Sequence, residues 1–141
     1  AEIFPDEGLD IVLNIFPRGG SNLTTTYIGL WTSFTASTVG SSSQTRSSYA
    51  ETDFGSYARQ SIAAASWGAI AAGTGGRKTT AGQVTFPTAT GAGTSAINGF
   101  GVYNALTLGS LVFSANFDDT TAVSIASGDT IRVTPTIQYN N

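Results

Sequence analysis

The 141-residue chain contains no histidine, no cysteine and no methionine. Their absence removes the commonest general base, the thiolate nucleophile and the usual ligands of zinc and copper. It also excludes a disulfide framework, so packing must hold the fold together. A catalytic serine would need a lysine as its base, and Lys78 is the only lysine. We therefore expect no catalytic residue, no metal site and no cofactor, and predict that the protein is not an enzyme.

Charge is also scarce. Six basic and nine acidic residues make up 11% of the chain and leave a net charge of -3. The basic residues are scattered, with only Arg77 and Lys78 adjacent, whereas binding to nucleic acid requires clustered lysine and arginine. No apolar run approaches the roughly 18 residues of a membrane span. We therefore expect neither a nucleic-acid partner nor a membrane partner.

Apolar residues are plentiful, and their spacing predicts one helix. Hydrophobic residues make up 40% of the chain, enough for one globular domain over residues 1–141. Within residues 5–16, four apolar residues follow the helical spacing i, i+3, i+4, i+7, namely Leu9, Val12, Leu13 and Phe16. Ile11 and Ile15 form a second stripe, so this N-terminal helical arm must be covered on both sides. Most apolar stripes are core, and we expect the helix to lie across its own sheet.

After Gly20 the apolar spacing changes to the two-residue alternation of strands. Residues 24–34 predict a strand covered on both faces, with Ile28 and Trp31 on opposite sides. Further strands are predicted at 57–67, 83–87, 97–106, 110–117 and 130–139, with glycine-rich breaks at 73–76 and 91–93. The last two are expected to be half-buried, with Pro135 at an edge or a bulge. Residues 35–56 are mostly small and polar and predict a flexible loop.

About seven short strands behind one short helix predict a mainly β protein. The expected architecture is an antiparallel β-sandwich or jelly roll.

Two motifs invite a chemical interpretation. Residues 73–79 resemble a phosphate-binding loop, but Arg77 replaces the required second glycine and no helix pattern follows. Three acids, Asp118, Asp119 and Asp129, would form a calcium site only if their turns were adjacent. Because aspartate is common in solvated turns, we predict ordinary turns at these positions.

Five short segments, taken in order, resemble a group of tailed-phage virion proteins. They are Asp6-Glu7-Gly8-Leu9-Asp10, Tyr27-Ile28-Gly29-Leu30-Trp31-Thr32, Tyr57-Ala58-Arg59-Gln60, Val84-Thr85-Phe86-Pro87 and Ser127-Gly128-Asp129-Thr130. Proteins of this group are labelled as tail-fibre, minor structural or head decoration proteins. The resemblance implies a virion structural protein and brings no catalytic residues with it.

Two functions are compatible with this resemblance. The preferred one is a capsid decoration (cement) protein, which would bind the major capsid protein at the capsid surface of a virion assembled in the bacterial cytoplasm. The alternative is an adhesion module of a tail fibre or knob. In that case Trp31, Tyr49 and Trp67 would contact glycans of the host surface.

Both functions require an interface, and excess apolar surface indicates where to look for it. We predict a homo-oligomer, most simply a trimer, because three-fold sites on a shell favour a three-fold binder. The predicted partner or oligomer interface consists of Leu9, Ile11, Val12, Ile15, Phe16, Tyr27 and Trp31.

Overall fold

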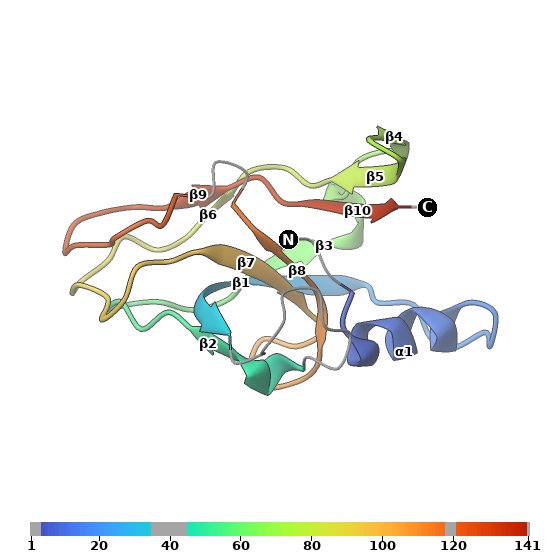
Figure 1. Cartoon of the computed structure of the whole chain (residues 1–141), viewed down its shortest axis with the longest axis horizontal. Helices are drawn as coiled ribbons and strands as arrows, with labels where there is room; N and C mark the ends of the chain where they lie inside the picture. The colour runs from blue at the N-terminus through green and yellow to red at the C-terminus, as the bar shows by residue number, and fades with distance from the viewer. Residues whose placement is uncertain (1–3, 35–44, 118–120, 141) are drawn as a thin grey trace.

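A computed structural model describes residues 4–34, 45–117 and 121–140 (Figure 1). These residues form one α-helix, two short 3-10 helices and ten strands, and every strand pairing is antiparallel. The elements are α1 (Asp6–Ile15), β1 (Thr25–Phe34), η1 (Arg46–Ser48), β2 (Tyr49–Glu51), β3 (Gln60–Ala63), η2 (Ala64–Ser66), β4 (Ala71–Gly73), β5 (Gly76–Thr80), β6 (Val84–Thr85), β7 (Gly99–Tyr103), β8 (Leu111–Asn116), β9 (Arg132–Val133) and β10 (Thr136–Asn140). The prediction of a mainly antiparallel β protein with one N-terminal helix is confirmed.

Strand β1 organises the larger sheet. It pairs with β7 along one side, and β7 pairs in turn with β8 at the edge. On its other side β1 is shared by β3, next to its first half, and by β2, next to its last residues. The strand predicted at 24–34 is therefore correct, and it holds the centre of a five-stranded sheet.

A long ribbon forms the second layer (Figure 1). Strands β5 and β6 run antiparallel to β10 and β9, and β4 extends this layer beside β5. Pro135 divides the strand that we predicted at 130–139, and the ribbon continues there because the N–H of Ala81 donates to the Pro135 carbonyl at 3.0 Å. Because β9 and β10, the strands before and after Pro135, both lie at the edge of their sheets, the edge position is the one of the two expected alternatives that the structure supports.

The glycine-rich break at 73–76 is the turn of a hairpin. Gly73 pairs with Gly76, so Thr74 and Gly75 form a two-residue turn. Gly75 has φ of +74°, a conformation that favours glycine. The flanking strands β4 and β5 were not predicted. Their small and polar residues, seen in Ala71–Gly73 and Gly76–Thr80, lack an apolar alternation.

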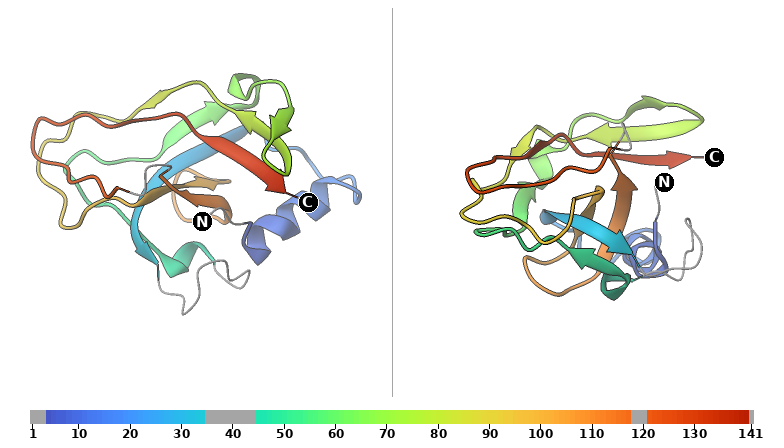
Figure 2. Two further views of the ribbon diagram at one scale, coloured as in Figure 1. Left: turned by 45° about the horizontal axis from the view of Figure 1, so that its top comes forward. Right: turned by 60° about the vertical axis from the view of Figure 1, so that its left-hand side comes forward.

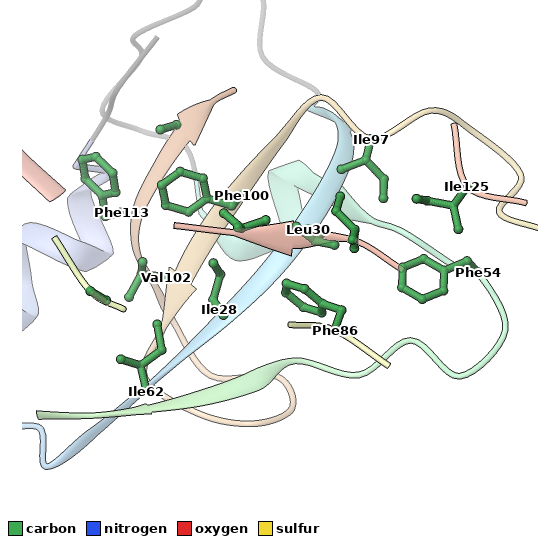
Figure 3. Close-up of a cluster of buried hydrophobic side chains, with 14 of the residues drawn as sticks. Ile28, Leu30, Phe54, Ile62, Phe86, Ile97, Phe100, Val102, Phe113 and Ile125 are labelled. Carbon is green, nitrogen blue, oxygen red and sulfur yellow. The ribbon is translucent and has the colours of Figure 1, made fainter. Parts of the chain in front are cut away.

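The main core fills the space between the sheet and the ribbon (Figure 3). Both layers contribute: Ile28, Val102 and Phe113 come from the sheet, whereas Phe86 and Val133 come from the ribbon. All five side chains are buried. Two layers with one apolar filling are the arrangement of a β-sandwich.

A second, smaller cluster covers the opposite face of β1. Trp31 packs there with Tyr49, Tyr103 and Leu111, and its Nε1 donates to the Phe100 carbonyl at 2.9 Å. A glycine is required opposite Trp31, because a Cβ at Gly99 would lie 2.5 Å from the indole ring. The prediction that β1 is covered on both faces is thus confirmed.

Two regions differ from the sequence-based expectation. Residues 35–44 of the predicted flexible loop lie outside the described residues, and residues 45–56 contain η1 and β2 instead of an open loop. Tyr49 and Phe54 explain the difference, since both are buried in the two clusters. Strand β8 is also not half-buried: its first five residues are buried, because α1 contacts it from outside the sheet.

Candidate interaction surface

Helix α1 is attached to the outer strand of the sheet by its first turns. Glu7 Oε1 accepts hydrogen bonds from the N–H of Leu111 and the N–H of Arg46, both at 2.6 Å. Gly8 touches the backbone of β8 so closely that a Cβ there would lie 2.1 Å from the Val112 carbonyl oxygen. Gly8 is the one buried residue of α1, which the structure describes in full.

The strongest apolar stripe of α1 faces away from the protein. Val12 is 40% exposed, Leu13 is 55% exposed and Phe16, at the C-terminal cap, is 78% exposed. Figures 1 and 2 show the cause, since the C-terminal half of the helix extends beyond the two layers. Leu9, the first residue of the stripe, is partly exposed.

This orientation corrects our expectation that the helix packs its apolar stripe on its own sheet. The inward face is formed by Gly8, with Ile11 and Ile15 half-buried on the same side. A small residue allows the closest backbone approach, so the glycine side and not the leucine side lies against β8. Among the residues predicted for the interface, Val12 and Phe16 are exposed and Leu9 is partly exposed, so a partner can reach them.

The two strand residues predicted for the interface are not on this surface. Trp31 is 2% exposed in the core, and Tyr27 is half-buried against the same cluster. The aromatic residues that we considered for glycan binding fare similarly: Tyr49 is buried and Trp67 is packed against the main core. The sequence does not reveal the second cluster, in which Trp31 and Tyr49 are buried and against which Tyr27 packs.

Charged residues border the exposed stripe on one flank. At 100° per residue, Asp6 and Asp10 lie on the Leu13 side of the stripe, and both are exposed. Arg18 follows the helix, and its backbone N–H donates to the Leu13 carbonyl at 3.4 Å. Arg18 and Asp10 line the same surface groove, which places Arg18 on this flank. The flank is thus acidic at the start of α1 and basic just after its end.

A largely buried ion pair that no sequence pattern predicts lies beside β1. The side chain of Arg59 is 4% exposed and forms a salt bridge with Glu51, the one salt bridge within the described ranges. The guanidinium also stacks over the ring of Tyr103 at 3.6 Å from its centroid. Glu51 is the last residue of β2, and Arg59 comes eight residues later, just before β3. The fold therefore brings them together.

Two tyrosines complete this network. The Tyr57 hydroxyl donates to Glu51 and accepts from the Leu30 N–H at 3.1 Å. Burial, followed by the negative charge of Glu51, raises the pKa of Tyr57 well above its ordinary value of 10.0. The same two causes raise the pKa of Tyr103 above 10.0. Both hydroxyls therefore stay protonated at neutral pH, and the network is structural in character.

Arg59 also fixes the loop between β7 and β8. One of its nitrogens donates to the carbonyls of Ala105 and Leu108, each at 2.9 Å. Leu108 has φ of +54°, an unfavourable conformation for leucine that such contacts maintain. The loop thereby presents Leu106 and Leu108 to solvent, a second exposed apolar feature.

A pocket of about 370 Å³ opens between β8 and the ribbon. Phe100 and Phe117 line one side and Val133 the other, and three polar residues, Asn116, Thr134 and Thr136, complete the walls. Arg132 is the one charged residue among the described lining residues, and it offers a binding contact without a general acid–base pair among them.

The remaining sequence candidates do not form sites in the described residues. Asp118 and Asp119 lie outside them, and Asp129 accepts a hydrogen bond from the Ala126 N–H within its own turn. No cluster of acidic ligands suited to a metal occurs in the part of the chain that the structure describes. Within the same ranges, no helix has the length and apolar character needed to cross a membrane.

Comparison with known proteins gives one clear result. A search of curated proteins finds no match. A family model described as "Podophage GP4 fiber I protein gp80" matches residues 12–137. The match runs from the exposed half of α1 into β10 and so includes both layers of the fold. The chain therefore belongs to the podophage GP4 fiber I protein gp80 family, a family of structural proteins of the tailed-phage virion.

Proposed function

We propose that this protein is a non-enzymatic structural subunit of a tail fibre in a podophage virion. The family match over residues 12–137 carries the proposal, because the description of the family names a fibre protein. From the sequence we preferred a capsid decoration protein and kept the fibre as the alternative. The family description supports that alternative and gives no support to binding on the capsid surface or to the major capsid protein.

The geometry favours a role in contacts between proteins over a role in binding sugars through aromatic residues. Trp31 and Tyr49, two of the three aromatic residues considered for glycan contact, are buried in the second cluster. Five of the seven large apolar side chains that are mostly exposed lie instead at α1 and on the loop before β8, typified by Phe16 and Leu108, and the other two are Ile70 and Tyr139. Exposed apolar patches of this kind mark surfaces that a protein partner covers.

Location in the virion tests the proposal directly. Gold-labelled antibodies against the chain should bind at the tail of intact virions, and quantitative mass spectrometry should give the low copy number of a tail component. Label spread over the head, with a copy number matching the many equivalent positions of a shell, would reinstate the decoration function. The homotrimer predicted from the sequence stays a prediction, and light scattering of the purified protein distinguishes its mass from that of the helix-paired dimer proposed below.

A further inference from the structure

The exposed stripe of α1 has the spacing by which one helix packs against another. Leu9, Val12, Leu13 and Phe16 repeat at i, i+3, i+4, i+7, as in the seam of a helix pair. Strand β8 occupies the sides of the helix that carry Glu7 and Gly8, and it leaves most of Leu13 and Phe16 exposed. The stripe is therefore free for a partner while the helix stays anchored.

The charges beside the stripe select the direction in which a second helix can lie. Asp6 and Asp10 stand at the start of α1, and Arg18 stands after its end on the same flank. None of the three makes a salt bridge within the described ranges. When two identical helices pack antiparallel about a two-fold axis, equal flanks face each other and their ends are exchanged. Arg18 of each copy then lies next to the acidic end of the other copy.

A parallel arrangement lacks this match. Parallel helices related by a two-fold axis place the acidic starts of the copies at the same level and their equal flanks on opposite sides of the pair, so Arg18 of one copy does not meet Asp6 and Asp10 of the other. Their helix dipoles are also aligned in the same direction, whereas antiparallel dipoles attract. We propose that α1 binds a second copy of this chain as an antiparallel helix pair centred near Leu13. The contact is independent of the location of the protein in the virion.

The absence of cysteine from the chain provides a direct test. In the proposed pair a Leu13→Cys thiol lies near the two-fold axis, close to its own copy and within reach of a disulfide, for which Cα atoms lie about 4.4–6.8 Å apart. A Leu9→Cys thiol lies four residues from the axis, so its copy is about 12 Å away along the helices, given a rise of about 1.5 Å per residue. Under mild oxidation we expect a cross-linked dimer from Leu13→Cys and none from Leu9→Cys.

The other outcomes are equally informative. Cross-linking of both variants would indicate parallel helices, as in a three-fold bundle, and would overturn the proposal. Cross-linking of neither variant would show that the stripe does not pair with itself. Circular dichroism confirms that each variant is folded, and light scattering of the wild type should approach twice the monomer mass of 14.5 kDa as concentration rises.

Charge exchange tests the direction by a second route. We expect Asp10→Arg and Arg18→Asp each to weaken dimerisation several-fold, because each places like charges opposite one another. The double variant restores an attractive pair with reversed signs and should recover most of the affinity. Arg77→Asp, on β5 of the ribbon, is the matched control and should leave dimerisation unchanged. A double variant no better than either single one would contradict the antiparallel arrangement.

Discussion

Helix α1 and strand β1 are both ten residues long and rich in apolar side chains, yet they differ in how much of that apolar surface is buried. Strand β1 is covered on both faces, with Ile28 in the main core and Trp31 in the smaller cluster. Helix α1 buries only Gly8 and exposes Phe16. Apolar patterning therefore shows that a segment will be covered, but it does not show whether the cover comes from the same chain.

The difference arises from the neighbours of each element. Strand β1 has β7 on one side and β2 and β3 on the other, and each neighbour brings side chains to both faces. Helix α1 has the start of β8 and the segment around Arg46 beside its first turns, and its second half extends past them. Four experiments test whether the two elements differ in this way.

A large effect is expected beside β1, in the ion pair of Arg59 and Glu51. Arg59→Ala leaves Glu51 without its cation and removes the donor to the Ala105 and Leu108 carbonyls. Loss of one partner of a buried pair costs about 3–5 kcal/mol. We expect the lower end, because Glu51 is partly exposed, measured by urea denaturation. Arg132→Ala on the exposed face of β9 should change stability by less than about 0.5 kcal/mol; equal losses in the two variants would contradict the assignment.

A pair of aromatic truncations compares the two elements directly. Trp31→Ala removes a fully buried ring and its hydrogen bond to Phe100, and should destabilise the protein by about 3–5 kcal/mol. Phe16→Ala removes an exposed ring and should change the stability of the dilute monomer by less than about 0.5 kcal/mol. Thermal and urea unfolding at low protein concentration measure both. A large loss from Phe16→Ala would mean that α1 contributes to the core after all.

A smaller effect is expected where the helix meets the sheet. Gly8→Ala places a Cβ against the Val112 carbonyl, and such overpacking costs about 1–3 kcal/mol. Helix propensity alone predicts the reverse, a gain of about 1 kcal/mol on replacing glycine by alanine. The sign of the change thus reports on the contact. Gly82→Ala, where a Cβ meets open space, is the control and should be nearly neutral.

The smallest effect concerns pH. Tyr57 and Tyr103 have folded-state pKa values raised above 10.0 by burial and by Glu51. As pH rises past about 10, the unfolded chain releases these protons before the folded protein does, so stability is full below that pH and falls above it. The slope is at most about 1.4 kcal/mol per pH unit for each tyrosine. Urea denaturation between pH 8 and 11 should show a shallower decline for Tyr57→Phe, and an unchanged slope would argue against the assignment.

Much of the fold was predictable because local patterns determine it. The alternation in 24–34 follows from which residues face the two clusters, and the spacing of 5–16 predicts a helix whether its stripe is covered by the same chain or not. Strands β4 and β5 escaped prediction because their residues are small or polar and pair through the backbone. Strand β2 escaped because only Tyr49 marks it among polar residues.

The candidate surface was predictable in part for the same reason. The α1 stripe was correctly identified as apolar, but whether it faces inward depends on Gly8, whose contact with β8 is tertiary. Trp31 was assigned to the interface although it is core, since its cover by Tyr49 and Tyr103 comes from distant segments. The Arg59–Glu51 pair depends on the fold alone, and the spacing of the two residues in the sequence does not predict it.

The contact between Glu7 and β8 has a consequence for how this protein can grow into larger structures. Strand β8 is the outer strand of its sheet, and an outer strand offers backbone groups on which another chain can add a strand. Here a carboxylate takes the N–H of Leu111, and the helix backbone at Gly8 lies against Val112. The first two residues of β8 are therefore not open to pairing with another strand. A copy that meets this edge at Leu111 and Val112 must join it through side chains and not by adding a strand.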